Sequence, residues 1–128
     1  MTVINGVEAK TKAVLTSWKE IENEQLMPLI QRQYLSTQTM TIARFNLAAG
    51  SSVPTHQHVN EQLSYVVTGR MKFVFPDSEV MVGAGEVLCI PANLPHSAHA
   101  IEDTYAIDVF TPNRADWESK NDGYLRGK

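Results

Sequence analysis

Two histidines on one side of an extended segment are the first residues in this chain that can do metal chemistry. His56 and His58 are separated by one residue, and alternate side chains of a strand point to the same face. Two such imidazoles can bind one divalent ion, although an isolated pair is more often exposed or hydrogen-bonded. Gln62 follows four residues after His58, so a short turn would bring its side-chain oxygen to the same point. A third histidine, His96, lies in a separate segment and strengthens the metal interpretation.

Around these residues the chain resembles a small single-domain cupin, of the cupin 2 type. The resemblance covers a first motif at residues 50–69 and a second motif at residues 85–100. The residues that match are Gly50, His56, His58 and Gly69 in the first motif, and Gly85, Pro91 and His96 in the second. It implies an all-β cupin fold, the double-stranded β-helix or jelly-roll barrel, with residues 1–128 forming a single domain.

Three positions depart from the cupin motifs. Gln62 stands where the family has Glu, Asn93 where it has Gly, and Ala100 where it has Asn. Asn is the commonest substitute for Gly where φ must be positive, so Asn93 is compatible with the expected turn. Only Gln62 changes the chemistry of the site.

The order of short apolar segments also favours an all-β sandwich or barrel. Residues 1–24 are expected to form an N-terminal arm, and Trp117 and Tyr124 predict that the short C-terminal tail folds back onto the body. The breaks between segments carry Gly, Pro, Asp and Ser, which favour turns. Strands are expected at residues 27–35, 39–47, 62–67, 70–75, 80–82, 86–90, 96–101 and 104–111.

Alternation along these strands decides which side chains can share a site. Gln62 and Ser64 lie on one face of their strand, whereas Glu61 would point away. A slip of one residue would make Glu61 the ligand instead, but only Gln62 keeps the family spacing. His99 falls on the face opposite to His96, so it is expected to lie outside the site. Tyr65 and Cys89 are expected in the core.

The predicted metal ligands are therefore His56, His58, Gln62 and His96. Three imidazoles and an amide oxygen suit one divalent ion such as zinc, nickel, manganese, iron or cobalt. The loss of the carboxylate raises the net charge of the site by one. A more electrophilic ion favours redox-neutral Lewis-acid chemistry over the activation of oxygen.

The segment 104–111 supplies a candidate acid or base. Asp108 is its one charged residue, and it shares a face with Phe110. Asp108 is a carboxylate in water at the sheet edge, a carboxylate that caps a buried amide, or a proton carrier inside the barrel. Arg114 is either a solvated arginine of the tail, or its guanidinium binds a substrate carboxylate through two parallel hydrogen bonds.

Together with the metal ligands, these residues resemble the pectin-degradation type of small cupin. The resemblance implies a metal-assisted opening of 4,5-unsaturated uronates to linear ketonised sugars. It implies that Asp108 transfers a proton, that Phe110 shapes the pocket and that Arg114 binds the substrate carboxylate. Two other functions stay open, namely a non-haem metal dioxygenase and a small-molecule-binding cupin without turnover.

Composition excludes several classes of partner. The formal net charge is −3, with 11 basic and 14 acidic residues that form no blocks, so neither nucleic acid nor a membrane surface is expected as a partner. No signal peptide or membrane span is visible, and the single cysteine fits a reducing compartment. The expected location is cytoplasmic. The resemblance implies a homodimer that acts on a small-molecule substrate.

Overall fold

The computed structural model describes residues 12–127, and almost all of its regular structure is β-strand. Three short helical turns accompany the strands: η1 (Trp18–Glu20), α1 (Ala115–Glu118) and η2 (Gly123–Arg126). The strands are β1 (Glu24–Met27), β2 (Ile30–Ser36), β3 (Thr41–Leu47), β4 (Ser52–His56), β5 (Glu61–Thr68), β6 (Arg70–Phe75), β7 (Ser78–Gly83), β8 (Val87–Ile90), β9 (His96–Ala100) and β10 (Thr104–Thr111). The predicted all-β class is confirmed.

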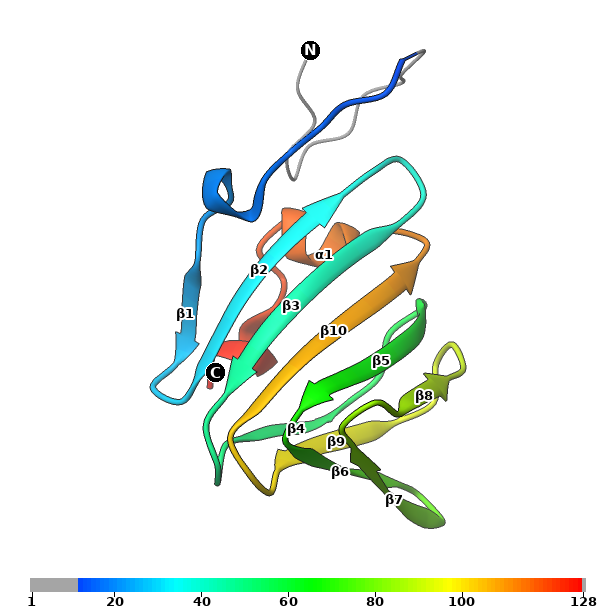
Figure 1. Cartoon of the computed structure of the whole chain (residues 1–128). Coiled ribbons are helices and arrows are strands. Elements are labelled where there is room, and N and C mark those ends of the chain that lie inside the picture. The colour runs from blue at the N-terminus through cyan, green and yellow to red at the C-terminus, as the bar shows by residue number, and fades with distance from the viewer. Residues whose placement is uncertain (1–11, 128) are drawn as a thin grey trace.

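The strands form two antiparallel sheets (Figure 1). The larger sheet has the order β1-β2-β3-β10-β5-β8, and the smaller sheet has the order β4-β9-β6-β7. Some consecutive strands pair within one sheet, as β2 and β3 do, whereas others cross between the sheets, as β4 and β5 do. The loop at residues 57–60 makes this crossing, and it carries the second of the paired histidines.

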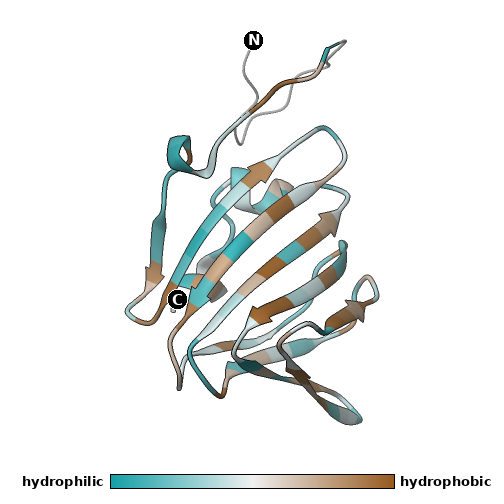
Figure 2. Ribbon diagram, in the orientation of Figure 1, coloured by the Kyte–Doolittle hydropathy of each residue, from teal (hydrophilic) through white to brown (hydrophobic). Residues whose placement is uncertain are grey.

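Strict alternation places one face of each central strand in the core. Along β5 the buried residues are Gln62, Ser64 and Val66, whereas Glu61, Leu63 and Tyr65 are exposed. Figure 2 shows the corresponding change of hydropathy from residue to residue along the strands. The predicted faces of this strand are confirmed, with Glu61 exposed and Gln62 buried.

Two details of the sequence prediction are wrong. The segment 27–35 is not one strand, because a turn at Pro28 and Leu29 separates β1 from β2. Tyr65 and Cys89 are not core residues, since both are exposed on the outward side of the larger sheet. Apolar side chains on an outward face follow the same alternation as core residues, so the pattern alone does not separate the two.

The C-terminal tail folds back, as predicted, and covers part of the inner face of the larger sheet (Figure 1). The Trp117 ring packs edge-on against Tyr34 of β2 and Phe45 of β3, at centroid distances of 5.1 and 6.2 Å. Trp117 and Leu125 are buried. This burial of a large aromatic side chain stabilises the docked tail.

The expected N-terminal arm is described only from residue 12, and its first eleven residues lie outside the described part. The described portion of the arm is exposed up to η1, and Leu15 is 98% exposed. In Figure 1 it extends away from the two sheets. Among residues 12–127, no helix is long and apolar enough to cross a membrane.

Candidate metal centre

Two of the three clustered histidines form a pair across neighbouring strands. His56 ends β4, His96 begins β9, and the register places the two residues directly opposite each other. The pairing shifts between Val53 and His56, which marks an irregularity in β4 just before the histidine. Side chains of directly opposed residues lie close together on one face. The smaller sheet therefore brings His56 and His96 together.

The third histidine comes from the loop that crosses between the sheets. The carbonyl of His58 accepts a hydrogen bond from the backbone N–H of Asn93 at 2.8 Å. Asn93 has a φ of 62°, so it takes the positive φ that was predicted for this position. The buried side chain of Asn60 donates to the carbonyls of Pro112 and Asn113, which ties the same loop to the end of β10.

The three imidazoles face one another closely enough to share one ion. One nitrogen from each ring lies within 4.8 Å of the others. The ring centroids of His56 and His96 are 4.4 Å apart, and those of His58 and His96 are 5.2 Å apart. The structure therefore brings together the three histidines that the sequence nominated.

Local hydrogen bonds fix the tautomer of each ring. Every one of the three Nδ1 atoms faces a backbone carbonyl two residues away, and a carbonyl can only accept, so Nδ1 carries the proton. Each Nε2 atom then holds a lone pair, which is the form that binds metals. The bonds join His56 to Pro54 at 2.8 Å, His58 to Asn60 at 3.0 Å and His96 to Leu94 at 2.8 Å.

Burial keeps the rings neutral. Desolvation lowers the pKa of His56 and of His58 from 6.5 to about 4, and it also lowers the pKa of His96. Hydrogen bonds to the carbonyls oppose this shift but do not cancel it. The Nε2 atom of His96 is buried and has no hydrogen-bond partner among the described residues. A buried nitrogen with an unused lone pair fits a metal ligand.

The environment of His58 is the strongest sign that a cation belongs here. The side-chain amide of Gln62 donates from Nε2 to Ser64 Oγ at 2.8 Å and to Asp108 Oδ2 at 3.4 Å. Its Oε1 atom is thereby directed at His58 Nε2, 3.1 Å away. A neutral imidazole already donating to Asn60 has no second proton to give. A cation bound by both His58 Nε2 and Gln62 Oε1 would satisfy the two facing lone pairs, so these residues fit a divalent ion.

The alternatives to these ligands lie elsewhere. Glu61 is exposed and faces away from the cluster. His99 lies on the opposite face of β9, where Ser52 and Ser97 each hydrogen-bond one of its ring nitrogens at 2.9 Å. The side of the strand that was predicted for His99 agrees with this position.

Asp108 lies beside Gln62 rather than in open water at the sheet edge. The register of β10 against β5 opposes Asp108 to Ser64 and Phe110 to Gln62. Burial among protein atoms raises the pKa of Asp108 from 3.8 to about 7, although the Ser64 hydroxyl and the Arg114 charge oppose this shift. The carboxyl group also lines the pocket, so it can both take up and release a proton near neutral pH.

Arg114 is buried at the other end of the same pocket, only 1% exposed, and is not a solvated tail arginine. Its guanidinium packs over the rings of Phe110 and Trp117, at 4.7 and 4.4 Å from the centroids. Nε and Nη2 both donate to the Asp116 carboxylate, at 2.9 and 2.7 Å. One bidentate edge of the guanidinium is therefore already used within the chain.

Two residues at this end were not identified from the sequence. Asp116 holds Arg114, and Tyr124 of η2 accepts a hydrogen bond from Arg114 Nη2. The Tyr124 ring also stacks on His56, with centroids 4.5 Å apart and planes inclined by 25°. The predicted folding back of the tail was the one signal that could have pointed to Tyr124.

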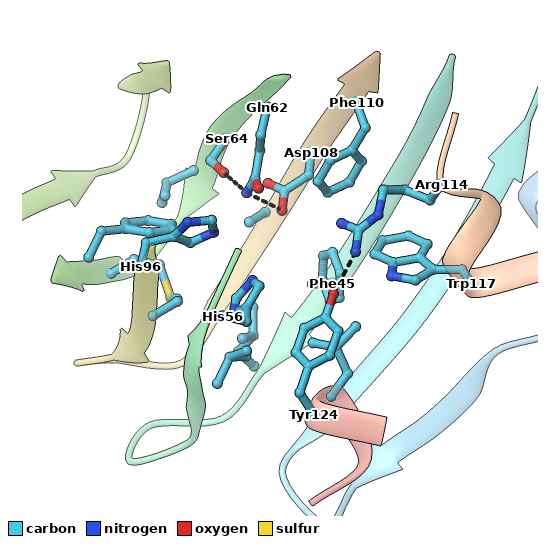
Figure 3. A pocket seen from close by; sticks show the side chains of 18 residues that line it. Phe45, His56, Gln62, Ser64, His96, Asp108, Phe110, Arg114, Trp117 and Tyr124 are labelled. Atoms are coloured by element: carbon cyan, nitrogen blue, oxygen red, sulfur yellow. Dashed lines mark hydrogen bonds between the residues drawn. The ribbon is translucent and has the colours of Figure 1, made fainter. Parts of the chain in front are cut away.

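Most of these groups line one pocket of about 60 Å³ between the sheets, although His58 and Asp116 are not among its lining residues (Figure 3). His56 and His96 lie at one end, Asp108 and Gln62 lie along one wall, and Arg114 and Tyr124 lie at the other end (Figure 3). The remaining wall is apolar, with Phe45, Val53, Met71 and Phe73 among its members. The arrangement places two imidazoles, a carboxyl group and a guanidinium around one pocket, a combination typical of small-molecule sites.

Comparison with known proteins gives consistent matches. The cupin domain family matches residues 43–110. An uncharacterised protein of Streptomyces coelicolor is 30% identical over 81 residues, which are 62% of this chain and 77% of that protein.

Solved structures extend the match beyond the family segment. KdgF from Halomonas sp. is 27% identical with a TM-score of 0.71, and the match covers 77% of this chain and 94% of that one. An RmlC-like cupin from Shewanella frigidimarina is 23% identical with a TM-score of 0.75, covering 83% of this chain and 96% of that one. The second of these similarities concerns the fold alone.

Proposed function

The chain belongs to the cupin family, and we propose that it is a metal-dependent enzyme that opens or isomerises a small anionic substrate without a change of oxidation state. A 4,5-unsaturated uronate is the substrate that best fits the site. The observation that carries the proposal is the set of three histidine Nε2 lone pairs and the Gln62 oxygen beside Asp108. The similarity of these residues to pectin-degradation cupins supports the substrate class.

His56, His58, Gln62 and His96 would hold one divalent ion, with zinc, nickel, manganese and iron as the candidates. When bound, such an ion acts as a Lewis acid toward a substrate oxygen. The ligands carry no negative charge, so the ion keeps its full positive charge. Asp108 stays outside the proposed ligand set and is available for proton transfer.

Ring opening of an unsaturated uronate needs one proton to move. The hydroxyl on the hemiacetal carbon loses its proton, the bond from that carbon to the ring oxygen breaks, and the resulting enolate becomes a ketone when carbon 4 takes up a proton. Asp108 would accept the proton from the hydroxyl and deliver it to carbon 4. A pKa of about 7 suits both halves of this transfer.

The other two residues would bind and orient the substrate. Arg114 would bind the carboxylate with the part of its guanidinium that the hydrogen bonds to Asp116 and Tyr124 leave unused. The Phe110 ring is buried between His58 and Trp117, at centroid distances of 5.8 and 5.2 Å, and would form a flat wall for the sugar.

The test is an assay with a 4,5-unsaturated uronate and the protein loaded with each candidate metal in turn. We expect the conjugated ultraviolet absorbance to disappear faster than the spontaneous rate, with no consumption of oxygen. Oxygen consumption with iron or manganese, abolished by zinc, would indicate a dioxygenase instead. Absence of turnover with every metal would contradict the enzymatic proposal.

We also propose a homodimer formed through the outward face of the larger sheet. Ile42, Leu63, Tyr65 and Val87 are each more than a third exposed there, and strand pairing makes them neighbours across β3, β10, β5 and β8. Arg44 of β3 borders these apolar residues, because it is opposed to Ile107 of β10, which is itself opposed to Tyr65. Monomers seldom expose so many apolar residues together, and a second copy of the same face would cover them.

Light scattering after gel filtration tests the dimer. Leu63→Glu places a charge at the centre of this face and should yield monomers, while metal content should stay unchanged. A wild-type protein that is monomeric at micromolar to hundred-micromolar concentrations would contradict the proposal.

We further propose a cytoplasmic location. Cys89 is the single cysteine of the chain and is exposed, so a disulfide within one copy is impossible. Cell fractionation with an antibody against the chain would test the location, and recovery in an oxidising compartment would contradict it.

A further inference from the structure

The C-terminal tail contributes a side chain that touches both ends of the pocket. The Tyr124 ring stacks on His56, and its hydroxyl oxygen accepts a hydrogen bond from Arg114 (Figure 3). Tyr124 lies outside residues 43–110, which are the part that matches the cupin family. The family match therefore says nothing about the role of this residue.

The hydrogen bonds of Arg114 leave one of its nitrogens unused. Nε and Nη2 are engaged by Asp116, and Nη2 also donates to Tyr124. Among residues 12–127, Nη1 has no hydrogen-bond partner, yet it is not among the buried unpaired atoms, so it reaches solvent. Because Arg114 lines the pocket, Nη1 can donate to a ligand there.

The Tyr124 hydroxyl group, which lies beside Arg114, is a second unused donor. Its oxygen accepts from Arg114, so its own proton is directed elsewhere. No described residue accepts that proton. An O–H group polarised by a neighbouring guanidinium is a strong donor to an anion.

We infer that Tyr124 is a substrate-binding residue, and that its hydroxyl and Arg114 Nη1 together bind the carboxylate of an anionic sugar. This inference rests on the proposed function for the substrate class and adds a specificity-determining residue to it. Two adjacent donors match the two oxygens of a carboxylate, and a neutral hydroxymethyl group at the same place offers one oxygen, which would leave one of these donors without an acceptor.

The docked tail holds Tyr124 in this position. Asp122, two residues earlier, accepts hydrogen bonds from Arg32 of β2 and from Arg126, and Leu125 is buried next to it. Because the backbone on both sides of Tyr124 is anchored, its hydroxyl is positioned before a ligand arrives. Preorganised donors of this kind favour binding because little ordering is required.

The test compares Tyr124→Phe with Tyr105→Phe in the full-length, zinc-loaded protein. Phe keeps the ring against His56 and removes only the hydroxyl, and Tyr105 does not line the pocket. Calorimetry would measure the affinity for D-galacturonate and for D-galactose, which differ in the carboxylate. Elemental analysis and thermal unfolding would show that both variants keep metal and fold.

We expect wild type and Tyr105→Phe to prefer galacturonate over galactose, and Tyr124→Phe to lose about 10- to 100-fold of that preference, as for a hydrogen bond to a charged group. Equal preference in Tyr124→Phe and wild type would overturn the inference, and so would a wild type that does not distinguish the two sugars.

Turnover of the unsaturated uronate is measured separately. A preference that falls in Tyr124→Phe in a protein without turnover would support this inference while contradicting the proposed enzyme. Turnover combined with an unchanged preference in Tyr124→Phe would support the proposed enzyme and contradict this inference.

Discussion

The two ends of the pocket are built in different ways. At the histidine end, each ring is oriented by a carbonyl only two residues away in sequence. At the arginine end, Arg114 and Tyr124 depend on a tail that is anchored by Asp122 to Arg32, ninety residues earlier. The comparison teaches that the metal ligands are preorganised locally, whereas carboxylate binding depends on long-range packing. Apart from the contact of Tyr124 with His56, changes at one end should therefore leave the other end working.

The largest effect is expected from His96→Ala. Loss of one of three imidazoles removes a ligand that the fold has already desolvated, and metal affinity should fall by more than about 100-fold, the upper end for loss of a supporting residue around a metal. Competition with a chromophoric chelator measures this affinity. His99→Ala is the matched control, since His99 lies on the other face of the same strand, and it should bind metal like wild type. Full metal content in His96→Ala would contradict the assignment.

Asp108→Asn should abolish most turnover without loss of metal. Asn cannot carry the proton, and the loss of general acid–base catalysis typically costs about 10²- to 10⁴-fold in rate. The ultraviolet assay gives kcat, and elemental analysis gives the metal content. Asp77→Asn, in the exposed turn between β6 and β7, is the control. If Asp108→Asn lost metal together with activity, Asp108 would belong to the metal site itself.

Asp122→Asn tests the arginine end through stability. Burial opposes ionisation, yet hydrogen bonds from Arg126 and Arg32 lower the pKa of Asp122 below 3.8. Arg32 is fully buried, so weakening this ion pair should lower the free energy of unfolding by about 2–3 kcal/mol at neutral pH. Urea denaturation measures this loss, and galacturonate affinity should fall while zinc affinity stays unchanged. Lost zinc binding would show that the two ends are not independent.

The pH dependence of the same variant follows from the sign of the shift. Because the pKa of Asp122 is lower in the folded state, the carboxylate stabilises the protein at any pH above its unfolded-state pKa of about 3.9. This contribution disappears as the pH falls through the pKa of the folded state. The difference between wild type and Asp122→Asn should therefore shrink in strong acid. A difference that grows on acidification would contradict the ion pair.

The smallest effect is expected from Glu102→Gln. Glu102 pairs with Arg70 at 3.6 Å, but both side chains are more than half exposed. An exposed pair contributes at most about 1 kcal/mol, so urea denaturation should barely distinguish this variant from wild type. If Glu102→Gln lowered the free energy of unfolding as much as Asp122→Asn does, the expected difference between buried and exposed ion pairs would be contradicted.

Sequence reasoning succeeded where local rules decide the outcome. Alternation placed Gln62 inside and Glu61 outside, and it separated His96 from His99, because strand side chains alternate strictly. The positive φ of Asn93 followed from the known substitutes for Gly. The fold class followed from the motif spacing, which the cupin domain match confirms.

Sequence reasoning failed for contacts between segments that are distant in the sequence. Nothing near Arg114 in the sequence indicates that Asp116 occupies one edge of its guanidinium, or that Tyr124 reaches His56. These contacts depend on how the tail docks, through Trp117, against the larger sheet. The outward position of Tyr65 likewise depends on which face of the sheet is covered.

The central claim is that His56, His58, His96 and Gln62 hold one divalent ion. Anomalous X-ray diffraction from crystals of the zinc-loaded protein, recorded on both sides of the zinc absorption edge, tests it directly. The account predicts a single strong peak about 2.0–2.2 Å from the three Nε2 atoms and from Gln62 Oε1. A cluster without a peak, or a peak bound by Glu61 or His99 instead, would contradict it.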